Sequence, residues 1–106
     1  MGDDMKHIKD IVEDIREEME GAMHYAKRAM EYKDSDRERA DKYAEMAKTE
    51  MSHAETLHTM AVKMIQKYVM EGGTAPAAMK AVWDWEHEKM IDEMGRVKSL
   101  LDMYRS

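Results

Sequence analysis

Strong helix breaks occur at only two places in the chain, since Gly21 and Gly95 each stand alone inside a periodic stretch, and this scarcity constrains the fold more than any other feature. One break is the polar segment 33–36, and the other is the segment 72–76, which holds two glycines and the one proline of the 106 residues. Alanine, glutamate, lysine, methionine and arginine, which all favour helices, dominate the remainder. We therefore predict three long helices, at about 4–33, 36–71 and 76–104.

The connections between these helices are short, so neighbouring helices must run antiparallel. Along each helix, apolar residues recur at spacings of three and four, which is the a/d pattern of packed helices. We predict an all-α fold, a three-helix antiparallel up-down-up bundle that forms a single domain over residues 1–106. Ser35 and Glu38 fit a capping box at the start of the second helix, and Pro76 suits the first turn of the third.

Charge and composition exclude several classes of function. The chain has 17 basic and 23 acidic residues, a net charge of −6, whereas sequence-independent nucleic-acid binding needs a basic surface. It has no cysteine, which rules out disulfides and thiolate metal sites. No segment is apolar for long enough to span a membrane, and the acidic N-terminus does not resemble a secretory signal. We expect a cytoplasmic protein.

Three carboxylates occupy positions where the a/d pattern calls for apolar residues, namely Glu50, Glu86 and Glu93. Burying a carboxylate is costly unless it is paired, protonated or bound to a metal. The ordinary explanation is an ion pair with a nearby lysine or arginine. Another is that these positions lie near the end of the bundle, where water still reaches the helix contact. The alternative is a metal site.

The sequence favours a metal site through a Glu-x-x-His motif, Glu50 to His53. Side chains at i and i+3 lie on one helix face, so a carboxylate and an imidazole at this spacing can bind one ion together. A second such motif, Glu55 to His58, carries less weight because the heptad pattern turns Glu55 outward. The first motif has its glutamate at an inward position.

Antiparallel pairing predicts which residues lie level with this motif. Folding the first two helices back on each other at residue 34 or 35 brings Glu18 beside His53 and Glu50. Folding the third helix back near residue 73 makes Glu93 its nearest inward carboxylate. The predicted metal ligands are therefore Glu18, Glu50, His53 and Glu93.

This set resembles the ferritin-like di-iron carboxylate proteins, such as rubrerythrin and the encapsulated ferritins. Glu18, Gly21 and Tyr25 match the pattern of their first helix, and the Glu50-x-x-His53 motif followed by alanine matches that of the second. The resemblance implies two iron ions bridged by Glu50 and capped by His53. Carboxylate oxygens with one imidazole also suit Mn or Zn. The resemblance also implies oxidation of Fe(II) by O₂ or peroxide, with Tyr25 beside the site.

The chain departs from the family in having no fourth helix and no second inward Glu-x-x-His motif. One chain therefore cannot complete a four-helix di-iron site. Encapsulated ferritins, which are short chains with half a site, imply that a homodimer completes it. We expect a homo-oligomer, with the enzymatic status of the protein left open.

A second hypothesis involves no cofactor. Glu18, Glu50 and His53 would form a buried polar network that fixes register, with Arg96 or Lys98 neutralising it. The chain would then be a helical interaction module that binds a protein partner through the third helix. That helix has a wide apolar face, which includes Trp85, Ile91, Met94 and Leu101.

A further pair of histidines, His58 and His87, should meet between the second and third helices, with Glu86 at the same level. These residues are either a second metal site or a stacked histidine pair, and the sequence leaves both open.

Overall fold

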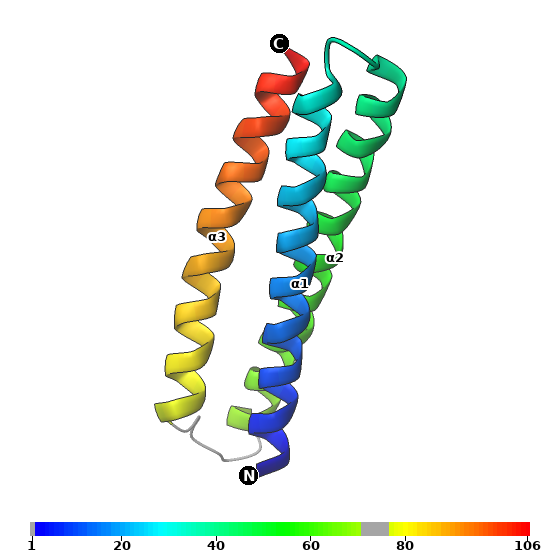
Figure 1. Cartoon of the computed structure of the whole chain (residues 1–106). Coiled ribbons are helices and arrows are strands. Elements are labelled where there is room, and N and C mark those ends of the chain that lie inside the picture. The colour runs from blue at the N-terminus through cyan, green and yellow to red at the C-terminus, as the bar shows by residue number, and fades with distance from the viewer. Residues whose placement is uncertain (1, 71–76) are drawn as a thin grey trace.

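The computed structural model describes residues 2–70 and 77–106, which form three α-helices (Figure 1). They are α1 (Gly2–Tyr32), α2 (Arg37–Met70) and α3 (Ala77–Arg105), and no strand occurs in these two ranges. The predicted all-α composition and the three helices are confirmed, while the predicted break at 72–76 lies outside the described residues. None of the helices in the described ranges combines the length and apolar character needed to span a bilayer.

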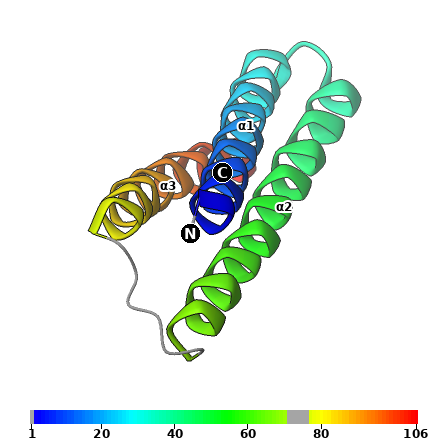
Figure 2. The ribbon, with the colours of Figure 1, turned by 90° about the horizontal axis from the view of Figure 1, so that it is seen from below.

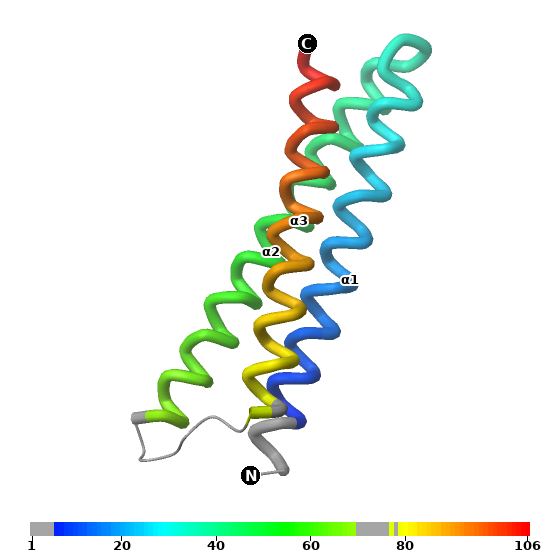
Figure 3. The backbone as a smooth tube through the Cα atoms, turned by 90° about the vertical axis from the view of Figure 1, so that its left-hand side faces the viewer, coloured from blue at the N-terminus to red at the C-terminus, as the bar shows by residue number. Residues whose placement is uncertain are grey.

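Helix α1 is the centre of the molecule, because α2 and α3 each pack along it, whereas the backbones of α2 and α3 come close to one another at few places (Figure 2). The C-terminal part of α2 leans away from both other helices (Figure 3). The described chain is elongated, with extents of 56 × 17 × 17 Å. Helix α1 therefore forms one seam with α2 and another with α3. Side chains of α2 and α3 also meet, as in the contact of His58 with His87 and the hydrogen bond that Tyr104 donates to Asp41.

Small side chains line the seam between α1 and α2. Its buried alanines are Ala22, Ala26 and Ala29 on α1 and Ala40, Ala44, Ala47 and Ala54 on α2. Larger residues fill the contacts of α3, including Met79, Met90, Met94, Val97 and Leu101. Because the distance between packed helices depends on the side chains at their contact, the alanines allow α1 and α2 to approach closely.

The start of α2 differs from the predicted capping box. Asp36, rather than Ser35, is the N-cap residue, because its Oδ1 accepts the Arg39 backbone N–H at 3.2 Å. Its carbonyl oxygen accepts the backbone N–H of Ala40 at 2.9 Å, which is the first intrahelical bond. Serine and aspartate are about equally favourable N-cap residues, so N-cap preference could not predict which of the two begins the helix.

Two polar contacts set the parallel register of α1 and α3. The Arg16 guanidinium donates to the Glu86 carboxylate at 2.6 Å, and the Lys33 ammonium donates to the Met103 carbonyl oxygen at 2.9 Å. Both pairs are 70 residues apart, as two parallel helices in one register require. Glu86 is buried, at 8% exposure, so the ion-pair explanation holds for this carboxylate.

The pair between Arg16 and Glu86 leads to a stability prediction. Arg16→Met should lower the free energy of unfolding by about 1–3 kcal/mol, because Glu86 would stay buried without a donor. The double variant Arg16→Met/Glu86→Met should recover most of this loss, since two apolar side chains replace the pair. Urea denaturation measures both, and a single variant as stable as the native chain would contradict the prediction.

Candidate metal centre

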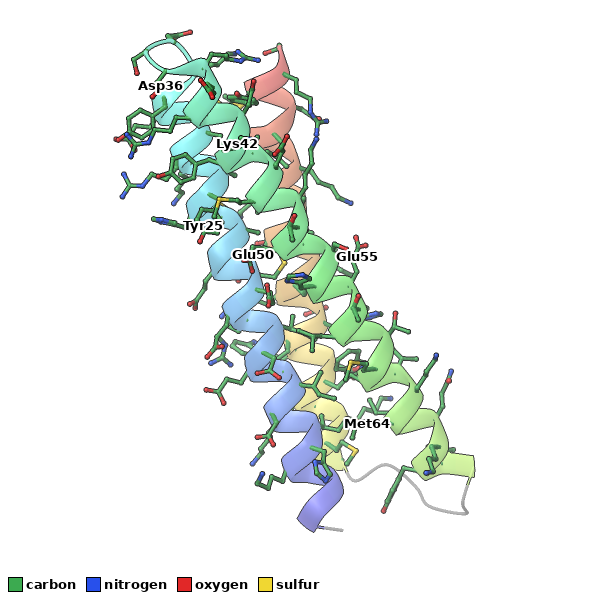
Figure 4. All side chains as sticks on the ribbon, turned by 90° about the vertical axis from the view of Figure 1, so that its right-hand side faces the viewer. Tyr25, Asp36, Lys42, Glu50, Glu55 and Met64 are labelled. Carbon is green, nitrogen blue, oxygen red and sulfur yellow. The ribbon has the colours of Figure 1, made fainter. Side chains whose placement is uncertain are left out.

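The structure brings three of the four predicted ligands together. Glu18 from α1 and Glu50 and His53 from α2 each place one donor atom within 4.8 Å of the others. His53 Nδ1 and Glu18 Oε2 are 3.3 Å apart. The group lies on the face of the α1–α2 pair opposite α3, where Figure 4 shows Glu50 between the two helices.

The local structure explains why these side chains meet. Glu50 and His53 are one turn apart on α2, so they share a face. The predicted antiparallel level of Glu18 agrees with its contact to His53. Buried alanines on both sides of the group, such as Ala22 and Ala54, keep the helices close enough for the side chains to meet.

The two carboxylates of the group repel each other when both are charged. A hydrogen bond with Glu18, which requires a shared proton, raises the pKa of the Glu50 carboxyl. Burial and the charge of Glu18 add to this rise, and His53 opposes it. Among the described residues, neither Glu18 nor Glu50 forms an ion pair with lysine or arginine. The two carboxylates therefore lack the partner that Glu86 has.

The donor set fits a transition-metal ion. Bonds of about 2.0–2.2 Å from oxygen or nitrogen to a metal place neighbouring donors roughly 3–4 Å apart, a range that includes the 3.3 Å between His53 and Glu18. Two carboxylates and an imidazole suit Fe, Mn or Zn. The side chain of His53 is 56% exposed and that of Glu18 is 26% exposed. Further coordination positions are thus open to water or to another chain.

The fourth predicted ligand, Glu93, lies on the other side of α1. It lines a groove between α1 and α3 together with Met19, Glu20, Met23, His24, Lys27 and Arg96. Glu18 and Glu20 are two residues apart, which turns them about 200° away from each other around α1. Glu18 therefore faces α2 and Glu20 faces the Glu93 side. The sequence predicted how far along the bundle Glu93 lies, but it did not predict on which side of α1.

The surroundings of Glu93 confirm that it belongs to a different group. Burial raises the pKa of Glu93, and the charges of Glu20 and Glu86 add to the rise. Lys89 opposes the rise, and its effect on the pKa is larger than that of either carboxylate taken singly. Arg96, one of the two residues predicted to neutralise the group, instead pairs with Asp92 on its own helix at 3.1 Å.

The second predicted cluster is an aromatic contact rather than a group of converging ligands. The ring centroids of His58 and His87 are 4.8 Å apart, as the antiparallel level predicted, and both rings lie near Trp83. Glu86 is held by Arg16 on the α1 side. Within the described ranges, the group of Glu18, Glu50 and His53 is the one set of three such residues with converging donor atoms.

The chain matches no protein-family model, no curated protein and no solved structure. No relative therefore assigns a role to Glu18, Glu50 or His53. The resemblance to ferritin-like proteins stays a prediction.

The raised pKa of Glu50 leads to a prediction for the metal-free protein. The folded chain holds this proton more tightly than the unfolded chain, whose ordinary value is 4.5. The free energy of unfolding therefore falls as pH rises above 4.5, and the loss persists at neutral pH. Glu50→Gln, measured with chelator present, should raise the free energy of unfolding at neutral pH by a few tenths to about 1 kcal/mol, since water screens both carboxylates.

The gain should vanish below about pH 4, where Glu50 is protonated in both states. Glu55→Gln is the matched control, because Glu55 is exposed on the same helix. Equal gains from both variants would show that the Glu18–Glu50 contact is not the cause.

The histidine pair leads to a second pH prediction, of the opposite sign. Burial lowers the pKa of His58 below 6.5, and the neighbouring His87 lowers it further. The unfolded chain takes up this proton near pH 6.5 and the folded chain resists it, so stability should fall as pH decreases through 6.5. Urea denaturation at about pH 7.5 and about pH 5.5 should show a smaller loss in His58→Gln than in the native chain.

His7→Gln is the control for this prediction, because His7 is exposed. It should lose as much stability on acidification as the native chain. A His58→Gln variant with an undiminished loss would contradict the explanation.

Proposed function

We propose that the protein binds a transition-metal ion, iron in the first instance, through Glu18, Glu50 and His53. The observation that carries this proposal is the convergence of two carboxylates and an imidazole within 4.8 Å, with no lysine or arginine paired to either carboxylate in the described ranges. A divalent cation would neutralise the charge and satisfy all three donors. Mn and Zn are the alternatives that the same donor set accepts.

The proposed activity is the ferritin-like oxidation of Fe(II), with iron as the substrate. Two Fe(II) ions supply the two electrons that reduce O₂, and two protons complete hydrogen peroxide. The motif of Glu18, Gly21 and Tyr25 and the Glu50-x-x-His53 motif support this proposal. The chain itself would hold the ions through carboxylates and position them through His53.

A second copy of the chain would complete the site. Three donors leave coordination positions empty, and a symmetric dimer would present two sets of Glu18, Glu50 and His53 to each other. Met46 and Met60 lie seven residues to either side of His53 on α2 and are 41% and 47% exposed. This spacing repeats on one helix face, so both methionines flank the group and would be covered by the second copy.

Iron retention by the full chain tests the proposal. Protein stripped with chelator and loaded anaerobically with Fe(II) should retain about one iron per chain after desalting, measured by elemental analysis, because two chains would share two ions. Glu50→Ala and His53→Ala should each abolish retention and keep the helical circular-dichroism spectrum. Glu55→Ala is a matched control from the second Glu-x-x-His motif, and Figure 4 shows that Glu55 lies apart from Glu50.

The control should retain iron like the native chain. Unchanged iron in both Glu50→Ala and His53→Ala, or no retention by the native chain, would overturn the metal site. Sedimentation of the loaded protein tests the dimer separately. Iron bound to a monomer would support the metal site and contradict the proposed dimer.

The competing function is a metal-free interaction module that uses α3. Trp85, Ile91 and Met103 are each more than half exposed. However, Trp85 and Met103 share one face, whereas Ile91 lies about 120° around the helix from them. The exposed apolar residues of α3 thus do not form a single stripe, and metal binding remains the better supported function.

A further inference from the structure

We propose that Gly21 is a positioning residue for the metal group, because its missing side chain leaves the space that the Glu50 carboxylate occupies. This inference rests on the proposed metal site for its consequence in binding. Its structural part, the fit between Gly21 and Glu50, holds with or without a metal.

The contact is tight and involves one side chain. A Cβ atom at Gly21 would lie 3.3 Å from Oε2 of Glu50, 3.4 Å from Cδ and 3.6 Å from Cγ. These atoms are the three nearest to that position, so the Glu50 side chain lies directly over the α1 backbone at Gly21. The carboxylate is held there beside Glu18, one turn earlier on α1.

Glycine in the middle of a helix needs a reason, because it lowers helix stability relative to alanine. Gly95 in the middle of α3 provides the comparison, since a Cβ at that position would meet nothing within 4 Å. The two glycines thus carry the same intrinsic helix penalty in different surroundings. Only at Gly21 would alanine disturb a candidate ligand.

A methyl group at position 21 would push the Glu50 carboxylate a few tenths of an ångström away from the α1 backbone. A shift of this size changes the distances from the Glu50 donor atom to those of Glu18 and His53, which lie within 4.8 Å of it. Residues that orient metal ligands typically change affinity by about 10- to 100-fold when replaced. The expected effect of one methyl group lies at the lower end of this range.

Anaerobic Fe(II) titration of the full chain against a competing chelator tests the role in binding. Gly21→Ala should bind Fe(II) about tenfold more weakly than the native chain, whereas Gly95→Ala should bind it equally well. Equal affinity of Gly21→Ala and the native chain would overturn the positioning role. A matching loss in Gly95→Ala would assign the effect to the helices in general.

Thermal unfolding in chelator tests the same fit without metal. Gly95→Ala should raise Tm by about 4–8 °C through helix propensity alone. Gly21→Ala should gain clearly less while Glu50 is present, and should gain the full amount in a Glu50→Ala background. Full gain in both backgrounds would overturn the inference.

The two experiments separate the possible failures. A native chain that retains no iron refutes the proposed function, and the thermal cycle still decides whether Gly21 makes room for Glu50. Iron binding by the native chain with additive thermal effects refutes the role of Gly21 and keeps the metal site.

Discussion

The close contact between α1 and α2 is the constraint on which the candidate site depends. Buried alanines recur on both helices, from Ala22 to Ala29 on α1 and from Ala40 to Ala54 on α2, and keep the side chains small along much of this seam. Glu50 can therefore reach across to α1. There it lies over Gly21, which has no side chain to block it. A seam of leucines would hold the helices further apart and separate Glu18 from His53.

The central position of α1 gives two inward glutamates different roles. On the α3 side, Glu86 is buried and paired with Arg16, and it sets the register of two parallel helices. On the α2 side, Glu50 meets a second carboxylate and an imidazole and no permanent cation. The first arrangement is complete within the chain. In the second, no lysine or arginine of the described residues pairs with either carboxylate, and His53 is the neighbour of Glu18.

Much of this arrangement follows from sequence periodicity, because helical spacing and short connections determine which residues are level with each other. The meeting of Glu18 with His53 and of His58 with His87 was predictable on these grounds. The direction of a side chain around its helix was not, since it depends on where the neighbouring helix lies. Glu93 was predicted from its level alone, and the structure places it between α1 and α3. The partnership of Arg16 with Glu86 was missed, although a constant difference in residue number between parallel helices could have revealed it.

By itself, the sequence determined three long helices, their antiparallel order and the shared face of Glu50 and His53, because these properties depend on local spacing and on the positions of helix-breaking residues. Only the tertiary structure decided that α1 lies between the other two helices and that Glu50 packs over Gly21. It also decided that Glu93 belongs to the α1–α3 seam. The physical reason is that helix packing depends on the summed shape and volume of many side chains, which no single motif encodes.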